Sequence, residues 1–322
     1  MRKFVVVLVA LSCLGIRVAQ AQVQFFPSKQ VTIIVPTDPG GLVDLLARTV
    51  GHGLSEAWRQ PVVVQNLPGA TYQIGTSRVA KSAPDGYTLL VVPETAFVAN
   101  QFLFSKLSYD PNQFAPVTGL VAVDTTLVVH AALPIQTMAQ LFDAARKDPG
   151  KLRFATFGLG SNSHLFLASL ESMAGVQFTP VHYKGVAAGL TDVMAGHVEV
   201  MFANPNNARG AAKQGKVRIL GTTGKMRLPG MPEVSVIAEL VPGYEAVAWF
   251  GLFAPPGTPV DIVEKISAET RRIIAGQAFQ EKLVIPNGFR PIASTPREFQ
   301  DFIRAETQKW GTVVKAANIK IE

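Results

Sequence analysis

The chain has 322 residues, a formal net charge of +7 and one cysteine. Such a length favours two lobes, each with enough core to be stable without disulfides. The lysines and arginines are scattered, with no run of five or more. We therefore exclude a disulfide-framework protein, and we do not expect nucleic-acid binding.

The N-terminus has the pattern of a targeting segment. Arg2 and Lys3 precede a short apolar run at 4–14, and small residues lead up to Ala21. This pattern predicts a signal peptide over residues 1–21, cleavage after Ala21 and a mature periplasmic protein with a net charge of +4, because three cationic residues are removed. Cys13 leaves lipidation as the alternative, although Ala-Leu-Ser before it is a poor lipobox. We find no later stretch apolar enough to cross a membrane.

The stretch from 31 to 48 organises the rest of the chain. Residues 31–35 form a β-branched run typical of a buried parallel strand, and apolar residues recur at helical spacing after position 42. Gly40 and Gly41 predict a tight turn between the two elements. A helix that starts there points free amides and its positive dipole end beyond the strand, which attracts carboxylate or phosphate. The alternative is an ordinary turn without a ligand.

Strands and helices alternate through most of the chain, which predicts parallel sheets flanked by helices. The expected strands cover 31–35, 61–65, 88–92, 125–130, 153–156, 178–181, 199–203, 217–221 and 248–254. Thr137, Thr258 and Thr295 are expected to cap helices, with Glu298 completing a capping box at the last one.

A second strand, glycine turn and helix start occur at residues 153–173, with the turn at Gly158–His164. We expect the chain to change lobe near 124 and to return near 250. The first lobe then comprises 22–124 plus 250–322, and the second comprises 125–249. Two crossings between two α/β lobes make a hinged clamshell that can close around a ligand.

Nine stretches, in the same order over nearly the whole mature chain, resemble the Bug-type periplasmic binding proteins of tripartite tricarboxylate transporters. Each stretch is weak alone, and their joint order is specific. They are VTIIVPTDPGGLVDLLAR at 31–48, the segment 61–75, APDGYT at 83–88, LSYDPNQFAPV at 107–117, DPGKL at 148–152, GLGSNSHL at 158–165, YKG at 183–185 with LTDVMAG at 190–196, 249–259, and 298–319.

The resemblance implies a clamshell of the type II periplasmic-binding-protein kind, each lobe a mainly parallel sheet flanked by helices. It implies capture of a small carboxylate and its delivery to membrane permease subunits. The ligand would be held mainly by backbone amides, bound water and hydroxyls of two loops. The expected ligand-binding residues are Thr37, Asp38, Gly40, Gly41, Asp44, Tyr72, Glu94, Gly158, Gly160, Ser161, Asn162, His164 and Asn204.

The chain departs from the family pattern where the cleft should lie, at 37–39, 71–73, 93–95 and Ala203. Asp38, Asp44 and Glu94 would bring three acidic side chains to the first-lobe wall. Such a wall would repel a di- or tricarboxylate and favour an amino acid or amide with one carboxylate. The alternative is that Asp38 and Glu94 face solvent or cap helices.

Other functions were weighed on the same residues. Ser161, Ser163 and His164 could suggest a nucleophile and base, but no nucleophile elbow or orienting acid accompanies them, so we predict no enzyme. The histidines lack metal-ligand spacing and the glycines lack a dinucleotide fingerprint, so no metal or cofactor is expected. A ligand sensor for a signalling partner remains open, and we expect a monomer.

Overall fold

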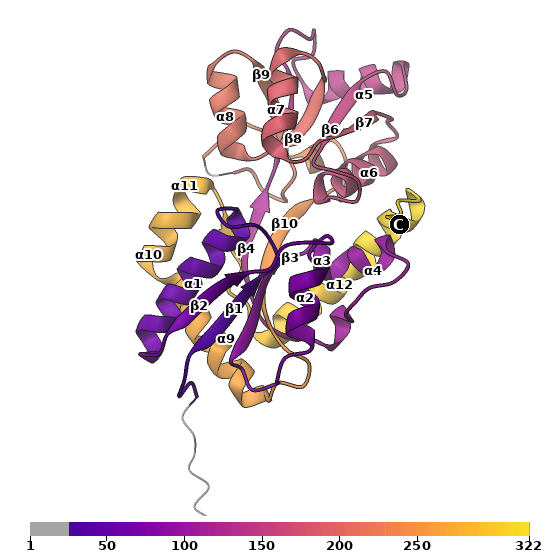
Figure 1. The fold of residues 1–322 in the computed structure, drawn as a ribbon. Helices are drawn as coiled ribbons and strands as arrows, with labels where there is room; N and C mark the ends of the chain where they lie inside the picture. The colour runs from indigo at the N-terminus through magenta and orange to yellow at the C-terminus, as the bar shows by residue number, and fades with distance from the viewer. Residues whose placement is uncertain (1–25, 229, 322) are drawn as a thin grey trace, which may run out of the picture.

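The computed structural model describes residues 26–228 and 230–321. The predicted signal peptide, Cys13 and the predicted cleavage point lie outside the described residues. Two sheets form two lobes, one above the other, and a pair of long strands runs between them (Figure 1). The two-lobed α/β fold is confirmed. Within the described part of the chain, no helix is long and apolar enough to span a membrane.

The first lobe is built on a six-stranded sheet of order β11-β4-β10-β3-β1-β2. Its N-terminal half alternates strands with helices as the hydrophobic pattern predicts. The elements are β1 (Val31–Val35), α1 (Leu42–Trp58), β2 (Val62–Asn66), α2 (Gln73–Ala80), β3 (Thr88–Pro93), α3 (Thr95–Val98), α4 (Asn100–Leu103), η1 (Pro111–Gln113) and β4 (Ala115–Asp124).

The second lobe contains a five-stranded sheet of order β7-β6-β8-β5-β9. The helices that follow its three mutually parallel strands begin at the edge that faces the first lobe (Figure 1). The elements are β5 (Thr126–His130), α5 (Met138–Lys147), β6 (Arg153–Thr156), α6 (Asn162–Ala174), β7 (Thr179–His182), α7 (Val186–Ala195), β8 (Val200–Ala203), α8 (Pro205–Lys213), β9 (Val217–Thr222) and η2 (Ile237–Glu239).

The chain rejoins the six-stranded sheet through β10 (Val247–Ala254), which lies antiparallel between β3 and β4. The C-terminal elements then cover the first lobe. They are α9 (Val260–Ala275), α10 (Gln277–Phe279), the π-helical turn η3 (Gln280–Val284), α11 (Ile285–Asn287), β11 (Arg290–Pro291) and α12 (Pro296–Ala316).

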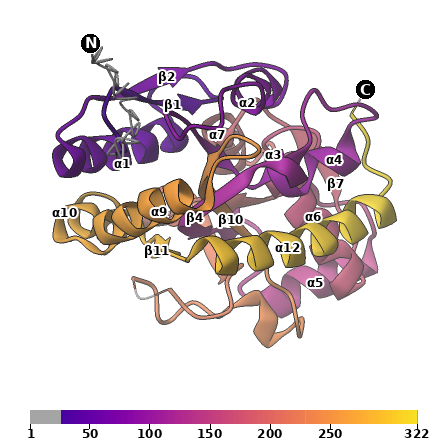
Figure 2. The same cartoon turned by 90° about the horizontal axis from the view of Figure 1, so that it is seen from below.

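Helix α12 joins the lobes by packing. It runs past β4 and β10 and reaches α6 of the second lobe (Figure 2). The rings of Trp310 and Phe166 stack there with centroids 5.3 Å apart, and both side chains are buried. Thr295 caps this helix and forms a capping box with Glu298, as predicted. The buried contact between α12 and α6 gives the two lobes a shared apolar core beside the crossing strands.

Two predictions about the elements are wrong. The sheets are mixed rather than mainly parallel, because β10, β11 and β5 pair antiparallel with their neighbours. In addition, strand β4, which carries the chain toward the second lobe, lies where the sequence pattern predicts no element. Thr258 does not cap α9, since its hydroxyl donates to the Pro255 carbonyl at 2.8 Å and the helix begins after Pro259. By contrast, Thr137 caps α5 as predicted.

Candidate functional site

A cavity of about 510 Å³ lies between the lobes, and we call it the cleft. Both lobes and both crossing strands contribute to its wall. Its volume is within the range of small-molecule sites, and such sites often occur between domains. The lining residues are Leu42, Val43, Thr71, Tyr72, Pro93, Thr95, Val123, Thr125, Phe157, Leu159, Gly160, Ser161, Asn162, Val186, Asn204, Ala248 and Phe250.

The cleft wall contains no ionisable acid, lysine, arginine or histidine among these lining residues. Its polar groups are threonine and serine hydroxyls, two asparagine amides and the Tyr72 phenol. Burial raises the pKa of Tyr72 to about 12, with nearby Glu94 adding to the shift, so its hydroxyl remains a neutral donor. An anion in this cavity would therefore be held by neutral donors and helix dipoles.

The first-lobe wall includes the start of α1. Gly40 has a φ of 87°, which allows the chain to turn sharply from β1 into the helix. Gly41 occupies the N-cap position and offers no side-chain acceptor to the helix amides. The amides of the first turn have no intrahelical partner, so they remain available to an anion near Leu42 and Val43.

Asp44 does not line the cleft. Its carboxylate accepts from Gly40 N at 3.0 Å and from Arg48 Nε at 2.9 Å. The amide of Asn66 donates to its other oxygen at 3.0 Å. The Arg48 hydrogen bond is the main reason why the pKa of Asp44 falls to about 2. Asp44 therefore holds the first glycine turn in shape, and its charge is compensated.

Thr37 and Asp38 also lie outside the cleft lining. The Thr37 carbonyl accepts from the Asn66 amide at 3.1 Å, and its buried hydroxyl has no partner. Asp38 is exposed, in agreement with the alternative that it faces solvent. The predicted acidic first-lobe wall is therefore absent from the described cleft.

Glu94 is buried behind the cleft wall, with an exposed fraction of 3%. Burial raises its pKa to about 8, against the opposing effect of the Glu94 and Trp249 backbone amides and the Asn162 side chain. One carboxyl oxygen accepts from Trp249 N at 3.3 Å, and the other has no hydrogen-bond partner within 3.5 Å among the described residues. At neutral pH the group is mostly protonated, so it does not supply the negative charge expected of it.

The second-lobe wall contains the turn before α6. Ser161 is the N-cap of this helix and accepts from His164 N at 3.4 Å. The Gly160 amide donates to His164 Nδ1 at 3.1 Å, and the Phe157 amide donates to Ser163 Oγ at 2.8 Å. This turn uses several amides internally and presents the side chains of Ser161 and Asn162 to the cleft.

His164 does not pair with a serine as a catalytic base would. Its Nδ1 accepts a backbone hydrogen bond, and its ring packs edge-on against that of His182 at 4.9 Å. Burial lowers the pKa of His164 to about 4, with His182 adding to the shift. Neither His164 nor Gly158 lines the cleft. The described residues also contain no group of three acids, histidines or cysteines arranged to hold a metal ion.

A smaller cavity of about 250 Å³ adjoins the cleft and shares Leu42, Val123 and Asn204 with it. Gly40 and Gly41 line this cavity, together with the start of α8. Asn204 is the N-cap of α8 but makes no capping hydrogen bond with its side chain. Of the predicted ligand-binding residues, the structure brings seven to these two cavities: Gly40, Gly41, Tyr72, Gly160, Ser161, Asn162 and Asn204.

Sequence reasoning missed several lining residues that follow strands. Thr95 comes shortly after β3, and Thr125 lies between β4 and β5. Thr125 is held in place by Thr223, whose hydroxyl accepts from Thr125 N at 2.9 Å. The carboxyl ends of strands form the binding edge of an α/β sheet, so recognising β4 would have pointed to Thr125.

Solved structures similar to this chain in sequence and fold include two with a bound carboxylate. An R. palustris protein whose structure was solved with adipate is 34% identical to this chain. The TM-score is 0.79, and the match covers 92% of this chain and 100% of that one. MatC from Rhodopseudomonas palustris with bound malate is 31% identical, with a TM-score of 0.74 over 90% and 100% of the two chains.

A curated relative and a family model extend the match. The relative is the UPF0065 protein in the tcbD-tcbE intergenic region of Pseudomonas sp. (strain P51), 37% identical over 90% of this chain and 86% of that protein. The family model for the tripartite tricarboxylate transporter family receptor matches residues 46–319. The predicted resemblance is confirmed, and this chain belongs to the tripartite tricarboxylate transporter family of receptors.

Proposed function

We propose that this protein is an extracytoplasmic receptor that binds a short dicarboxylate in the cleft and delivers it to a membrane permease. This proposal rests mainly on one observation: the cleft has no charged lining residues, and it has the uncapped start of α1 on one wall and Ser161 and Asn162 on the other. Charge-assisted hydrogen bonds from such donors contribute about 1.5–3 kcal/mol each, so a few suffice for micromolar binding.

The predicted preference for an amino acid loses its basis in the structure. Asp44 is paired with Arg48, Glu94 is protonated near pH 7, and Asp38 lies outside the lining. No acid on the first-lobe wall therefore repels a second carboxylate or attracts an ammonium group. Adipate and malate, which are bound in the similar proteins, set the size of ligand that we propose.

Titration calorimetry with the purified protein tests the ligand class. Adipate and malate should bind with micromolar affinity, while adipamide, which has the same length without charge, should bind at least a hundredfold more weakly. An amino acid such as glutamate carries an ammonium group that finds no acidic partner in the cleft, so it should also bind weakly. Tight binding of glutamate with no binding of adipate or malate would contradict the proposal.

Export and delivery need separate experiments. N-terminal sequencing of the protein from the periplasmic fraction should begin near Gln22 if residues 1–21 are a cleaved signal peptide. Deletion of the gene should abolish uptake of labelled dicarboxylate without affecting its metabolism in permeabilised cells. Normal uptake after deletion would exclude an essential delivery role and favour a sensor.

A further inference from the structure

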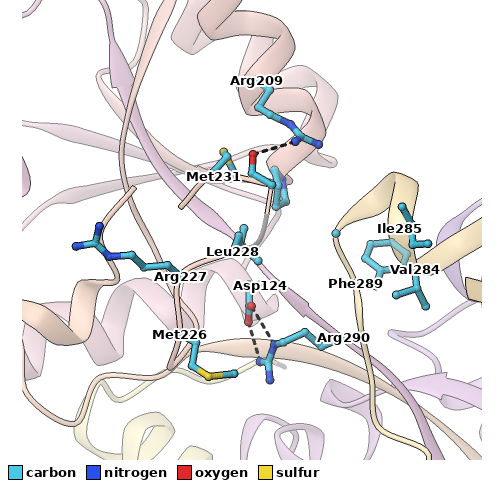
Figure 3. Close-up of a pocket in the computed structure, with 13 residues that line it drawn as sticks. Asp124, Arg209, Met226, Arg227, Leu228, Met231, Val284, Ile285, Phe289 and Arg290 are labelled. Atoms are coloured by element: carbon cyan, nitrogen blue, oxygen red, sulfur yellow. Dashed lines mark hydrogen bonds and ion pairs between the residues drawn. The ribbon is translucent and has the colours of Figure 1, made fainter. Parts of the chain in front are cut away.

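A second cavity, of about 680 Å³, lies beside the crossing strand β4, and we call it the hinge cavity. The second lobe contributes α8 and the segment after β9, and the first lobe contributes the region from η3 to β11 (Figure 3). It shares no lining residue with the cleft. Its lining residues are Asp124, Pro205, Arg209, Met226, Arg227, Leu228, Gly230, Met231, Val284, Ile285, Gly288, Phe289 and Arg290.

Two of the three arginines at this cavity are neutralised. Arg290 makes two hydrogen bonds to the buried carboxylate of Asp124, at 3.0 and 2.9 Å. Arg227 makes two to Glu239, both at 2.9 Å. The charge of these guanidinium groups is therefore largely used in holding the walls together.

Arg209 is different, because among the described residues its guanidinium bonds only to neutral oxygens. It donates to the Asn206 side chain and, at 3.4 Å, to the Gly230 carbonyl. No carboxylate of the described residues lies within 4.0 Å of it. The hinge cavity therefore contains one uncompensated positive charge, half-buried on the second-lobe wall.

The remaining lining is mainly apolar and surrounds this charge on both sides. Met231 lies near Arg209 and Leu228 lies beside Asp124, while Val284, Ile285 and Phe289 lie across from them (Figure 3). Several of these side chains are buried, whereas Met226 and Ile285 are each 70% exposed. Unbranched methionine adapts its shape to different apolar ligands. The volume is also typical of ligand sites between domains.

We propose that the hinge cavity is a second ligand site, for a monocarboxylate with an apolar body whose carboxylate binds Arg209. A single fixed cation selects one anionic group, and the apolar walls favour an aliphatic or aromatic body. This site is independent of the proposed cleft ligand, because a dicarboxylate would have to place its second charge against apolar side chains.

Calorimetric titration with sodium octanoate tests the proposal. The protein is first saturated with adipate, so that the cleft is occupied. Octanoate should bind at one site, and Arg209→Met should weaken it at least tenfold. Lys213→Met removes an exposed cation from the end of the same helix and should leave octanoate affinity unchanged. Acetate and octan-1-ol, which keep only the charge or only the chain, should each bind at least tenfold more weakly than octanoate.

A second variant separates this site from any nonspecific apolar surface. Met226→Asp adds a negative charge at an exposed position of the cavity lining, so it should fold normally and weaken octanoate binding at least threefold. Equal octanoate affinity in the wild type, Arg209→Met and Met226→Asp would overturn the proposal, as would absence of octanoate binding at millimolar concentration. Displacement of octanoate by adipate in the wild type would place it in the cleft instead.

Discussion

The two glycine turns that face the cleft have nearly the same design in sequence, and in both the glycine amide donates to a side chain four residues further on; they differ in the side-chain cap of the helix that follows. In the first turn, helix α1 has no side-chain cap, and the Gly40 amide donates to the Asp44 carboxylate. The second turn caps α6 with Ser161 and closes its Gly160 amide onto His164. A strand, a glycine turn and a helix start therefore do not by themselves specify an anion site. What matters is whether side chains of the turn already occupy its amides.

The largest effect should come from removing the support of the first turn. Asp44→Ala leaves Gly40 N without its acceptor, removes one of the two acceptors of the Asn66 amide and removes the carboxylate partner of Arg48. We expect a loss of about 2–4 kcal/mol in the free energy of unfolding, measured by urea denaturation at pH 7. Asp38→Ala, in the same loop but exposed, is the matched control and should change stability by about 0.5 kcal/mol or less. Equal effects in the two variants would contradict the assigned role.

The two turns can be made alike by adding a cap to the first. Gly41 has extended backbone angles, and a Cβ there would meet only the Asp38 carbonyl oxygen, at 4.0 Å. Gly41→Ser should therefore fold and place its hydroxyl on the first-turn amides of α1. We expect a stability gain of a few tenths of a kcal/mol and about tenfold weaker adipate binding by calorimetry, because one anion donor is occupied. Unchanged adipate affinity would show that these amides do not bind the ligand.

As pH falls, the second turn should lose its contribution to stability at a higher pH than the first turn does. The pKa of His164 is about 4 in the folded protein and 6.5 when unfolded, so the unfolded state binds more protons between these values. The contribution of His164 to the free energy of unfolding is therefore complete above pH 6.5 and disappears as pH falls to 4. We expect the free energy of unfolding of the wild type to fall by about 1–2 kcal/mol over this range, after allowance for the partial exposure of His164.

His164→Asn should reduce this pH dependence, measured by urea denaturation at pH 7 and pH 4.5. His197→Asn, which alters an exposed histidine, is the control and should retain it. The contribution of Asp44 is lost only from pH 3.8 down through about 2, so it does not interfere in this window. A pH dependence that is identical in the wild type and both variants would mean that His164 is not the group responsible.

The smallest effect concerns Glu94, which lies behind the cleft and near Asn162 of the second turn. Its pKa of about 8 means that the carboxyl is neutral at pH 6.5. Glu94→Gln should therefore change adipate affinity less than threefold at that pH. Above pH 8 the wild-type carboxyl ionises and repels the ligand, so its affinity should fall while that of Glu94→Gln remains constant. Markedly tighter adipate binding by Glu94→Gln at pH 6.5 would restore the idea of an acidic cleft wall.

Features governed by neighbours along the chain could be predicted from the sequence. A helix follows the first glycine turn as expected, and the caps at Thr137 and Thr295 are present, because helical periodicity and capping involve residues only a few positions apart. The alternation of strands and helices and the position of both glycine turns follow from the same short-range signals. The joint order of motifs also identified the family.

Only the tertiary structure decided which groups face the cleft and in what charge state. Asp44 and Asp38 are six positions apart, yet one is buried against Arg48 and Asn66 and the other is exposed. Glu94 is neutral because elements distant in sequence exclude water from it. The antiparallel partners of β10 and the Thr125–Thr223 contact likewise join residues that are far apart in the chain. Burial and pairing depend on long-range contacts, so local sequence patterns could not determine them.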